Sequence, residues 1–94
     1  MAERHKRGVV GAVKAADGRP IMGAVIDAKS LDEPSPPIPE RIVLSGADGR
    51  YFWPLLPGDY ELRATATGYR TATARVRVGA GALTDADFAL DEAR

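Results

Sequence analysis

The sequence predicts an all-β fold in which seven short strands form a two-sheet sandwich. Its apolar residues recur mainly with a period of two, which is typical of a half-buried strand rather than a helix. Its 94 residues include Gly 10 and Pro 7, and these mark turns after roughly every ten positions. A chain of this length has room for one core. We therefore expect residues 1–94 to form a single domain with an ordered core at about 8–90.

The first two strands are predicted on either side of a tight turn. Small or apolar residues stand at alternate positions in Val9, Gly11 and Val13. The dipeptide Asp17-Gly18 then predicts a turn, because glycine accepts a positive φ and aspartate can bond to its own backbone. A second alternating strand is predicted over residues 24–29.

A proline-rich loop separates the second strand from the third. Leu31 to Glu40 holds four prolines, which cannot donate to a ladder, so this stretch is predicted to be a loop. Strand-like residues at 41–45 are followed by the turn Gly46-Ala47-Asp48-Gly49. The short aromatic strand Tyr51–Trp53 comes next and ends before Pro54.

The last three strands are predicted over residues 60–67, 72–78 and 86–90. In the hairpin around Gly68, a three-residue turn brings core residues Leu62 and Val76 opposite each other. On the outer face, this register places Glu61 beside Arg77 and Arg63 opposite Arg75. The shorter two-residue turn would point the arginines inward, where unpaired charge is costly. Residues 1–6 and 91–94 have no partner in the pattern and are expected to fray.

Composition excludes several classes of function. Lys+Arg 13 balances Asp+Glu 13, so no net field would attract a nucleic acid or an anionic membrane. Cys 0 removes disulfides, thiolate metal sites and cysteine nucleophiles, and His 1 removes any site with two imidazoles. The apolar run at residues 8–13 is too short for a signal-peptide core, and no stretch is long enough to span a membrane. We expect a soluble protein without enzyme activity, cofactor, metal, nucleic-acid partner or membrane insertion.

Two stretches combine turn and aromatic residues in a recognisable order. The first runs Gly11-Ala12-Val13, Asp17-Gly18-Arg19-Pro20-Ile21 and Gly23-Ala24-Val25-Ile26. The second runs Ala47-Asp48-Gly49-Arg50-Tyr51-Phe52-Trp53, Leu56-Pro57-Gly58-Asp59-Tyr60-Glu61-Leu62 and Gly68-Tyr69. Together they resemble carboxypeptidase regulatory-like domains over roughly residues 8–90.

The resemblance implies a fold and a setting. It implies a seven-stranded Greek-key sandwich of the prealbumin-like (transthyretin-like) type, which usually accompanies other domains and has no chemistry of its own. If the chain is an excised domain, the resemblance also implies a secreted or cell-surface protein. The large side chains of the motif are expected to fill a core otherwise built from small residues; they are Tyr51, Trp53, Leu56, Tyr60 and Leu62.

A candidate contact surface can be named from the alternation. Because Tyr51 and Trp53 are predicted to face inward, Phe52 should point outward, and Leu55 should lie exposed in the following turn. Arg63, Arg75 and Arg77 are predicted on one outer face, where they form either a basic stripe for acidic groups or an ordinary solvated face.

These residues predict a structural or interaction module that contacts another protein or domain. One alternative is a carbohydrate-binding module or adhesin-type surface repeat that holds a glycan through exposed aromatic residues. Another is self-association through an unpaired sheet edge. The carbohydrate alternative needs a planar pair of outward aromatic rings, and only Phe52 is predicted to point outward.

Overall fold

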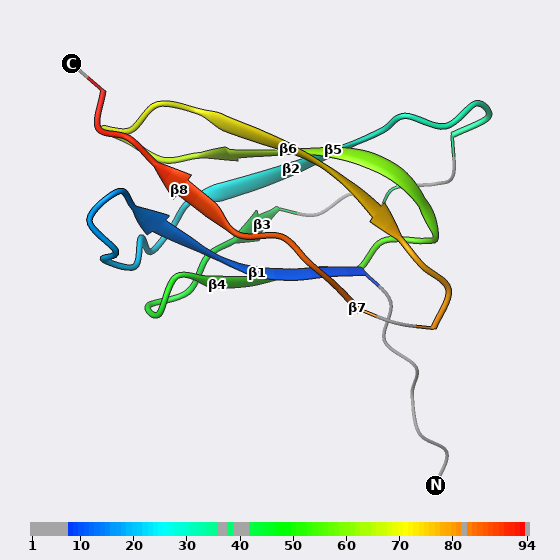
Figure 1. Ribbon diagram of the computed structural model, residues 1–94, viewed down its shortest axis with the longest axis horizontal. Coiled ribbons are helices and arrows are strands. Elements are labelled where there is room, and N and C mark those ends of the chain that lie inside the picture. Colours follow the sequence, from blue (N-terminus) through cyan, green and yellow to red (C-terminus); the bar gives the residue numbers. More distant parts are fainter. Residues whose placement is uncertain (1–7, 36–37, 39–41, 82, 94) are drawn as a thin grey trace, which may run out of the picture.

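The computed structural model describes residues 8–35, 38, 42–81 and 83–93, which form two stacked β-sheets (Figure 1). The described chain contains eight strands, in the order β1 (Gly8–Ala15), β2 (Val25–Ser30), β3 (Val43–Leu44), β4 (Arg50–Trp53), β5 (Gly58–Thr65), β6 (Ala72–Val78), β7 (Leu83–Asp85) and β8 (Phe88–Leu90). The predicted all-β sandwich is confirmed, but with eight strands instead of seven. None of these residues forms a helix that is long and apolar enough to cross a membrane.

Each sheet is organised around a long strand. In the first sheet β1 lies between antiparallel β4 and the parallel strands β7 and β8. The second sheet has the order β3-β2-β5-β6, with all neighbours antiparallel. In Figure 1 the strands β2, β5 and β6 form the upper layer and β1, β4 and β7 the lower one.

The additional strand arises at an interruption opposite Gly11. Strands β7 and β8 pair with β1 at the same offset, since Val10 lies opposite Asp85 and Val13 opposite Phe88. Between them, a Cβ on Gly11 would lie 1.8 Å from the Ala86 carbonyl oxygen, so only glycine permits this close approach. The Ala12 N–H donates to Oδ1 of Asp87 at 2.9 Å, in place of a backbone carbonyl. A side chain thus maintains the connection where the regular ladder stops.

The core fills the space between the sheets with inward-facing side chains. Trp53 is 3% exposed, and its Nε1–H donates to the Ile26 carbonyl across the sandwich at 2.6 Å. Tyr60 and Leu62 on β5 are fully buried, as the alternation predicts. The expectation that the aromatic motif serves the core is therefore confirmed for Trp53 and Tyr60.

The register of the β5–β6 hairpin differs by two residues from the predicted one. Leu62 lies opposite Ala74, not Val76, although the predicted inward and outward faces are correct. The turn is centred on Gly68, whose φ of 87° suits glycine. The observed register also replaces the predicted Arg63–Arg75 pair with two opposite-charge pairs, Glu61–Arg75 and Asp59–Arg77.

The C-terminal segment joins the two sheets, contrary to the expectation that it frays. Beyond β8, the Asp91 carbonyl accepts the Arg70 N–H at 2.8 Å, and the Ala93 N–H donates to the Gly68 carbonyl at 2.9 Å. Figure 1 shows the chain rising from the lower layer along β8 to the upper layer. The prediction for residues 1–6 lies outside the described residues.

Candidate functional site

The predicted contact residues do not form one surface. Phe52 lies on the outer face of the first sheet and is 40% exposed, as predicted. Arg63, Arg75 and Arg77 are exposed on the outer face of the second sheet, on the other side of the sandwich. Leu55 belongs to neither face.

Leu55 is buried, so its assignment to an exposed turn is wrong. It is 2% exposed and belongs to the core, whereas the neighbouring Leu56, which we expected in the core, is 37% exposed. The strand ends at Trp53, before Pro54, and strand alternation no longer fixes side-chain direction beyond this point. The packing of the loop beneath the sandwich decides instead which leucine is buried.

The outer face of the second sheet, which we call the β5 face, carries charges of both signs in adjacent positions. Glu61 on β5 lies between Lys29 on β2 and Arg75 on β6. Asp27 lies opposite Arg63 on the neighbouring strand. Opposite charges on neighbouring strands attract each other across the sheet. The predicted basic stripe is therefore interleaved with acids.

Arg77 has the best-defined charge partner on the β5 face. Its Nε lies 2.9 Å from Oδ1 of Asp59, and Nη2 lies 3.3 Å from Oδ2 of the same carboxylate. This side-chain hydrogen bond, together with the carboxylate charge, raises the pKa of Arg77. A shallow hollow of about 220 Å³ nearby is lined by Asp27, Ala28, Lys29, Glu61 and Arg63. A ligand there would meet charges of both signs.

The outer face of the first sheet, which we call the β1 face, has a different composition. Two rows of residues cross its strands in the order β4, β1 and β7/β8; they are Phe52–Val10–Asp85 and Arg50–Ala12–Asp87. In these two rows the middle strand presents small apolar side chains, and the exposed Lys14 follows two residues further along β1. Basic Arg50 lies to one side of it and the two acids lie to the other.

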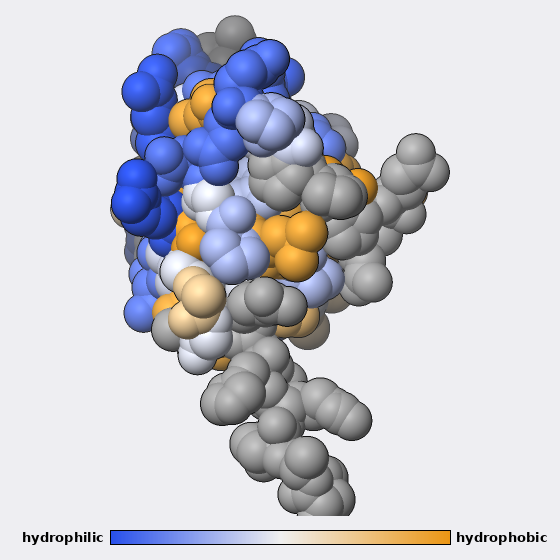
Figure 2. Space-filling view, turned by 90° about the vertical axis from the view of Figure 1, so that its right-hand side faces the viewer, coloured by the Kyte–Doolittle hydropathy of each residue, from blue (hydrophilic) through white to orange (hydrophobic). Residues whose placement is uncertain are grey.

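Exposed leucines lie at the end of the sandwich where β1 begins. Leu31, Leu56 and Leu83 are 42%, 37% and 45% exposed, respectively. Figure 2 looks onto this end and shows apolar side chains near its middle, with hydrophilic ones to the upper left. Leu31 and Leu56 come from two separate loops and Leu83 from the start of β7, so the apolar surface at this end is not continuous.

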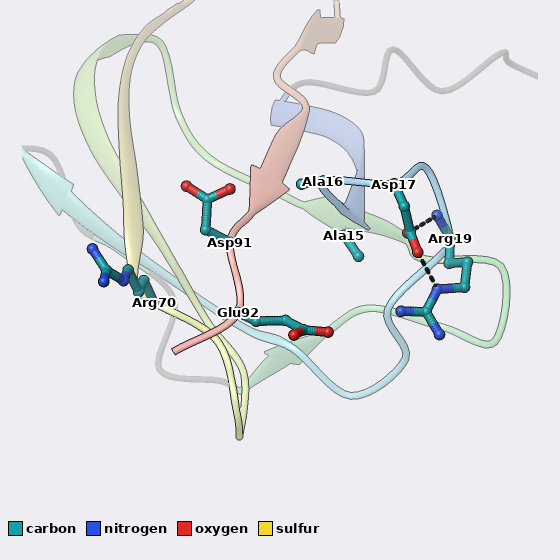
Figure 3. A pocket seen from close by; sticks show the side chains of 7 residues that line it. All are labelled: Ala15, Ala16, Asp17, Arg19, Arg70, Asp91 and Glu92. Carbon is teal, nitrogen blue, oxygen red and sulfur yellow. Dashed lines mark hydrogen bonds and ion pairs between the residues drawn. The ribbon is translucent and has the colours of Figure 1, made fainter. Parts of the chain in front are cut away.

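A larger hollow opens at the opposite end of the sandwich (Figure 3). Its volume is about 480 Å³, and it is lined by Ala15, Ala16, Asp17, Arg19, Arg70, Asp91 and Glu92. Arg19 Nε lies 2.7 Å from Oδ2 of Asp17, and hydrogen bonds from the backbone and side chain of Arg19 lower the pKa of that carboxyl. Figure 3 shows the Glu92 carboxylate extending into the hollow and the Arg70 guanidinium pointing away from it.

This hollow does not gather the groups that a metal or a general acid–base pair needs. Within the described part of the chain, no group of three His, Cys, Asp or Glu residues could hold a metal ion. The hollow is open, and Asp17 is already bonded to its neighbour. Turn chemistry accounts for Asp17, because its Oδ1 also accepts the Arg19 N–H.

The buried polar side chains bond to the backbone of the sandwich. The Tyr51 hydroxyl donates to the Ala86 carbonyl at 2.5 Å, and the Tyr60 hydroxyl donates to the Leu56 carbonyl at 2.7 Å. Burial, and then the Asp87 carboxylate, raise the pKa of Tyr51. These hydroxyls therefore stay protonated and hold strands and loops in place.

Ser45 is a structural residue that the sequence did not reveal. Its side chain is buried, its Oγ accepts the Ala24 N–H at 2.9 Å, and its hydroxyl donates to the Ile21 carbonyl at 2.6 Å. A single serine next to a glycine-rich turn is ordinary in a loop, so no pattern identified it. Asp87 is a second such residue, because its carboxylate takes the place of a ladder carbonyl.

Comparisons with known proteins agree on the type of domain. The family model described as "Carboxypeptidase regulatory-like domain" matches residues 8–91. The chain is 35% identical over 88 residues to the carboxypeptidase N catalytic chains of Rattus norvegicus and Mus musculus. The match covers 94% of this chain but spans only 18% of each of these relatives.

Two solved structures with the same fold are streptococcal pilins. A streptococcal ancillary pilin superposes with a TM-score of 0.76 at 15% identity, over 98% of this chain and 34% of the pilin. A minor pilin of Streptococcus agalactiae superposes with a TM-score of 0.71 at 15% identity, over 95% of this chain and 46% of that one. At this identity the likeness shows the fold alone. The family match, covering nearly the whole chain, shows that this protein belongs to the carboxypeptidase regulatory-like domain family.

Proposed function

We propose that the protein is a non-catalytic module that makes contacts with another protein or domain. The observation that carries this proposal is the exposed Phe52 ring on the β1 face, next to the small apolar side chain of Val10. An exposed aromatic residue beside small apolar neighbours is typical of a contact surface. The β5 face, by contrast, is covered with opposite charges in adjacent positions.

The family supports the non-catalytic part of the proposal. This chain matches the regulatory-like domain model and aligns with 18% of the length of the carboxypeptidase N catalytic chains. In the described part of this chain, Tyr51, Tyr60 and Ser45 use their hydroxyls to bond backbone carbonyls. Groups bonded in this way serve the architecture and are not poised for reaction.

The proposal is tested by binding measurements on a matched pair of variants. Phe52→Ser removes the exposed ring on the β1 face, and Leu44→Ser removes a 53% exposed apolar side chain from the second sheet. Binding of the purified chain to itself, and to any domain encoded in the same reading frame, is measured by calorimetry. We expect Phe52→Ser to lose binding and Leu44→Ser to keep it. Equal binding by both variants, or turnover of ester, peptide or glycoside substrates by the wild-type chain, would overturn the proposal.

A glycan-binding role has less support from the same surface. Sandwiches of this kind bind sugars through flat exposed aromatic rings, and among the described large hydrophobic residues Phe52 is the exposed ring. A glycan array separates the two functions. Binding that disappears in Phe52→Ala would favour the glycan, whereas a blank array leaves the protein contact as the better account.

A further inference from the structure

The two outer faces distribute their charges differently. On the β1 face, Arg50 is on β4, and Asp85 and Asp87 are on the opposite side of β1. Between them lie Val10 and Ala12. With strands about 4.8 Å apart, the basic and acidic backbones are roughly 10 Å from each other, so the face separates charges that the β5 face places side by side.

Arg50, Asp85 and Asp87 form no ion pair among the described residues. Among the described residues the ion pairs are Arg19–Asp17 and Arg77–Asp59, and neither involves the β1 face. Asp87 accepts one backbone N–H through Oδ1, which leaves its other oxygen available. The face therefore has one basic side and one acidic side, both able to accept a partner of opposite charge.

A two-fold rotation makes this pattern complementary to itself. Rotating a second copy by 180° about an axis along β1 lays its β7/β8 side over the β4 side of the first copy. Arg50 and Asp87 both lie level with Ala12, so each Arg50 then faces the partner's Asp87 at the same height along the axis. A two-fold axis running across the strands would instead place β4 against β4, with no acid opposite Arg50. The charges select one of the two arrangements.

We propose that a second copy of this chain docks on the β1 face through a two-fold axis parallel to β1. This inference rests on the proposed function as a contact module and names its partner. The small side chains of Val10 and Ala12 let the two sheets approach to about 10 Å, the usual spacing of stacked sheets. Because Phe52, Val10 and Asp85 share one row, the same axis lays Phe52 of each copy level with Val10 and Asp85 of the other.

The size of the face predicts a weak, concentration-dependent dimer. Three strands of up to eight residues cover about 14 by 26 Å, which is roughly 360 Å² in plan. Stable interfaces bury about 800 Å² per partner. The association therefore depends on its charge pairs, and added salt weakens it.

The edge of β6 is less suited to self-association than this face. At one end the Thr84 hydroxyl donates to the Arg77 carbonyl at 3.0 Å, and at the other the Arg70 N–H donates to the Asp91 carbonyl. Contacts at both ends leave only the middle of the strand open to another chain. Closure of this kind is how sheets restrict edge-to-edge pairing.

Lys14 provides an independent check of the axis. It lies on β1, two residues beyond Ala12, and its side chain is exposed on the same face. An axis along β1 brings the two copies of Lys14 near each other, and like charges repel. Lys14→Gln removes this repulsion and is therefore expected to strengthen the dimer.

The test is sedimentation equilibrium of the full chain over a concentration series, with charge-reversal variants. Arg50→Glu places acid against acid and is expected to weaken dimerisation about tenfold or more. Asp85→Lys reverses the other side without disturbing the Asp87–Ala12 hydrogen bond, and it should also weaken self-association. Arg63→Glu makes the same charge change on the β5 face and should leave the dimer unchanged.

Several results would contradict self-association through the β1 face. A wild-type chain that stays monomeric up to about 1 mM would overturn the proposal. Equal weakening by Arg50→Glu and Arg63→Glu would overturn it too. A monomer that still binds a domain of its own reading frame through Phe52 would contradict self-association while leaving the contact function intact.

Discussion

The two outer faces of this sandwich are built on the same strand geometry but handle charge in opposite ways. On the β5 face, Glu61 lies between Lys29 and Arg75, so opposite charges lie side by side on neighbouring strands. On the β1 face, Arg50 and the two acids lie on opposite sides of Val10 and Ala12. Opposite charges that already lie side by side gain little attraction from a partner. Separated charges gain attraction only when a partner brings the opposite charge close.

The largest effect on stability is expected from a buried residue in the core between the two faces. Trp53→Ala should lower the free energy of unfolding by about 3–5 kcal/mol, because it removes a buried aromatic ring and its bond to Ile26. Phe52→Ala, one residue earlier and pointing outward, should cost less than about 1 kcal/mol. Urea unfolding of both variants measures the difference. Similar losses would mean that the inward and outward assignments of β4 are wrong.

The next largest effect on stability is expected where β1 passes the junction of β7 and β8. Gly11→Ala should destabilise the protein by about 1–3 kcal/mol, since its Cβ would lie 1.8 Å from the Ala86 carbonyl oxygen. Gly79→Ala is the control, because an added Cβ there meets nothing within 4 Å. Hydrogen exchange should show the loss first at Ala12 and Ala86. Equal stability of the two variants would contradict the close contact.

Alkaline pH should weaken the same junction. The folded state raises the pKa of Tyr51 above its ordinary value of about 10, through burial and the Asp87 carboxylate. The unfolded chain therefore releases this proton at lower pH than the folded one, so stability falls as pH rises above about 10. Thermal unfolding between pH 9 and about 11.5 checks the slope, which Tyr51→Phe should reduce. An unchanged slope would remove Tyr51 as its cause.

The smallest effect is expected on the β5 face. Arg77→Ala removes the ion pair with Asp59, but both side chains are well exposed and water screens the pair. We expect a slight lowering of the melting temperature that disappears at high salt. A loss as large as that of Gly11→Ala would show that the β5 face depends on this pair far more than its exposure indicates.

Alternation along the strands predicted much of the sandwich. It identified Trp53 and Tyr60 as inward and Phe52 as outward, because a strand fixes these directions locally. It could not fix Leu55 and Leu56, which lie beyond the end of β4. It also missed β7, since Leu83–Asp85 follows a glycine-rich link and is too short to alternate recognisably.

Long-range placement was the harder part of the prediction. Parity placed Arg63, Arg75 and Arg77 outward, but it carries no information on which sheet a strand joins, so Phe52 was grouped with residues on the opposite face. The β5–β6 register is shifted by two residues, and alternation cannot detect such a shift because the same side chains still face the core. Opposite-charge pairing across the outer face would have favoured the observed Glu61–Arg75 register over the like-charge Arg63–Arg75 alternative.

The contrast between the faces is tested most directly by following backbone amide resonances as the protein concentration rises. Shifts confined to the β1 face, at Val10, Ala12 and Phe52, and reversed by added salt, are the result that we predict. Shifts concentrated at Arg63 and Arg75 on the β5 face, or spread evenly over both faces, would contradict the account.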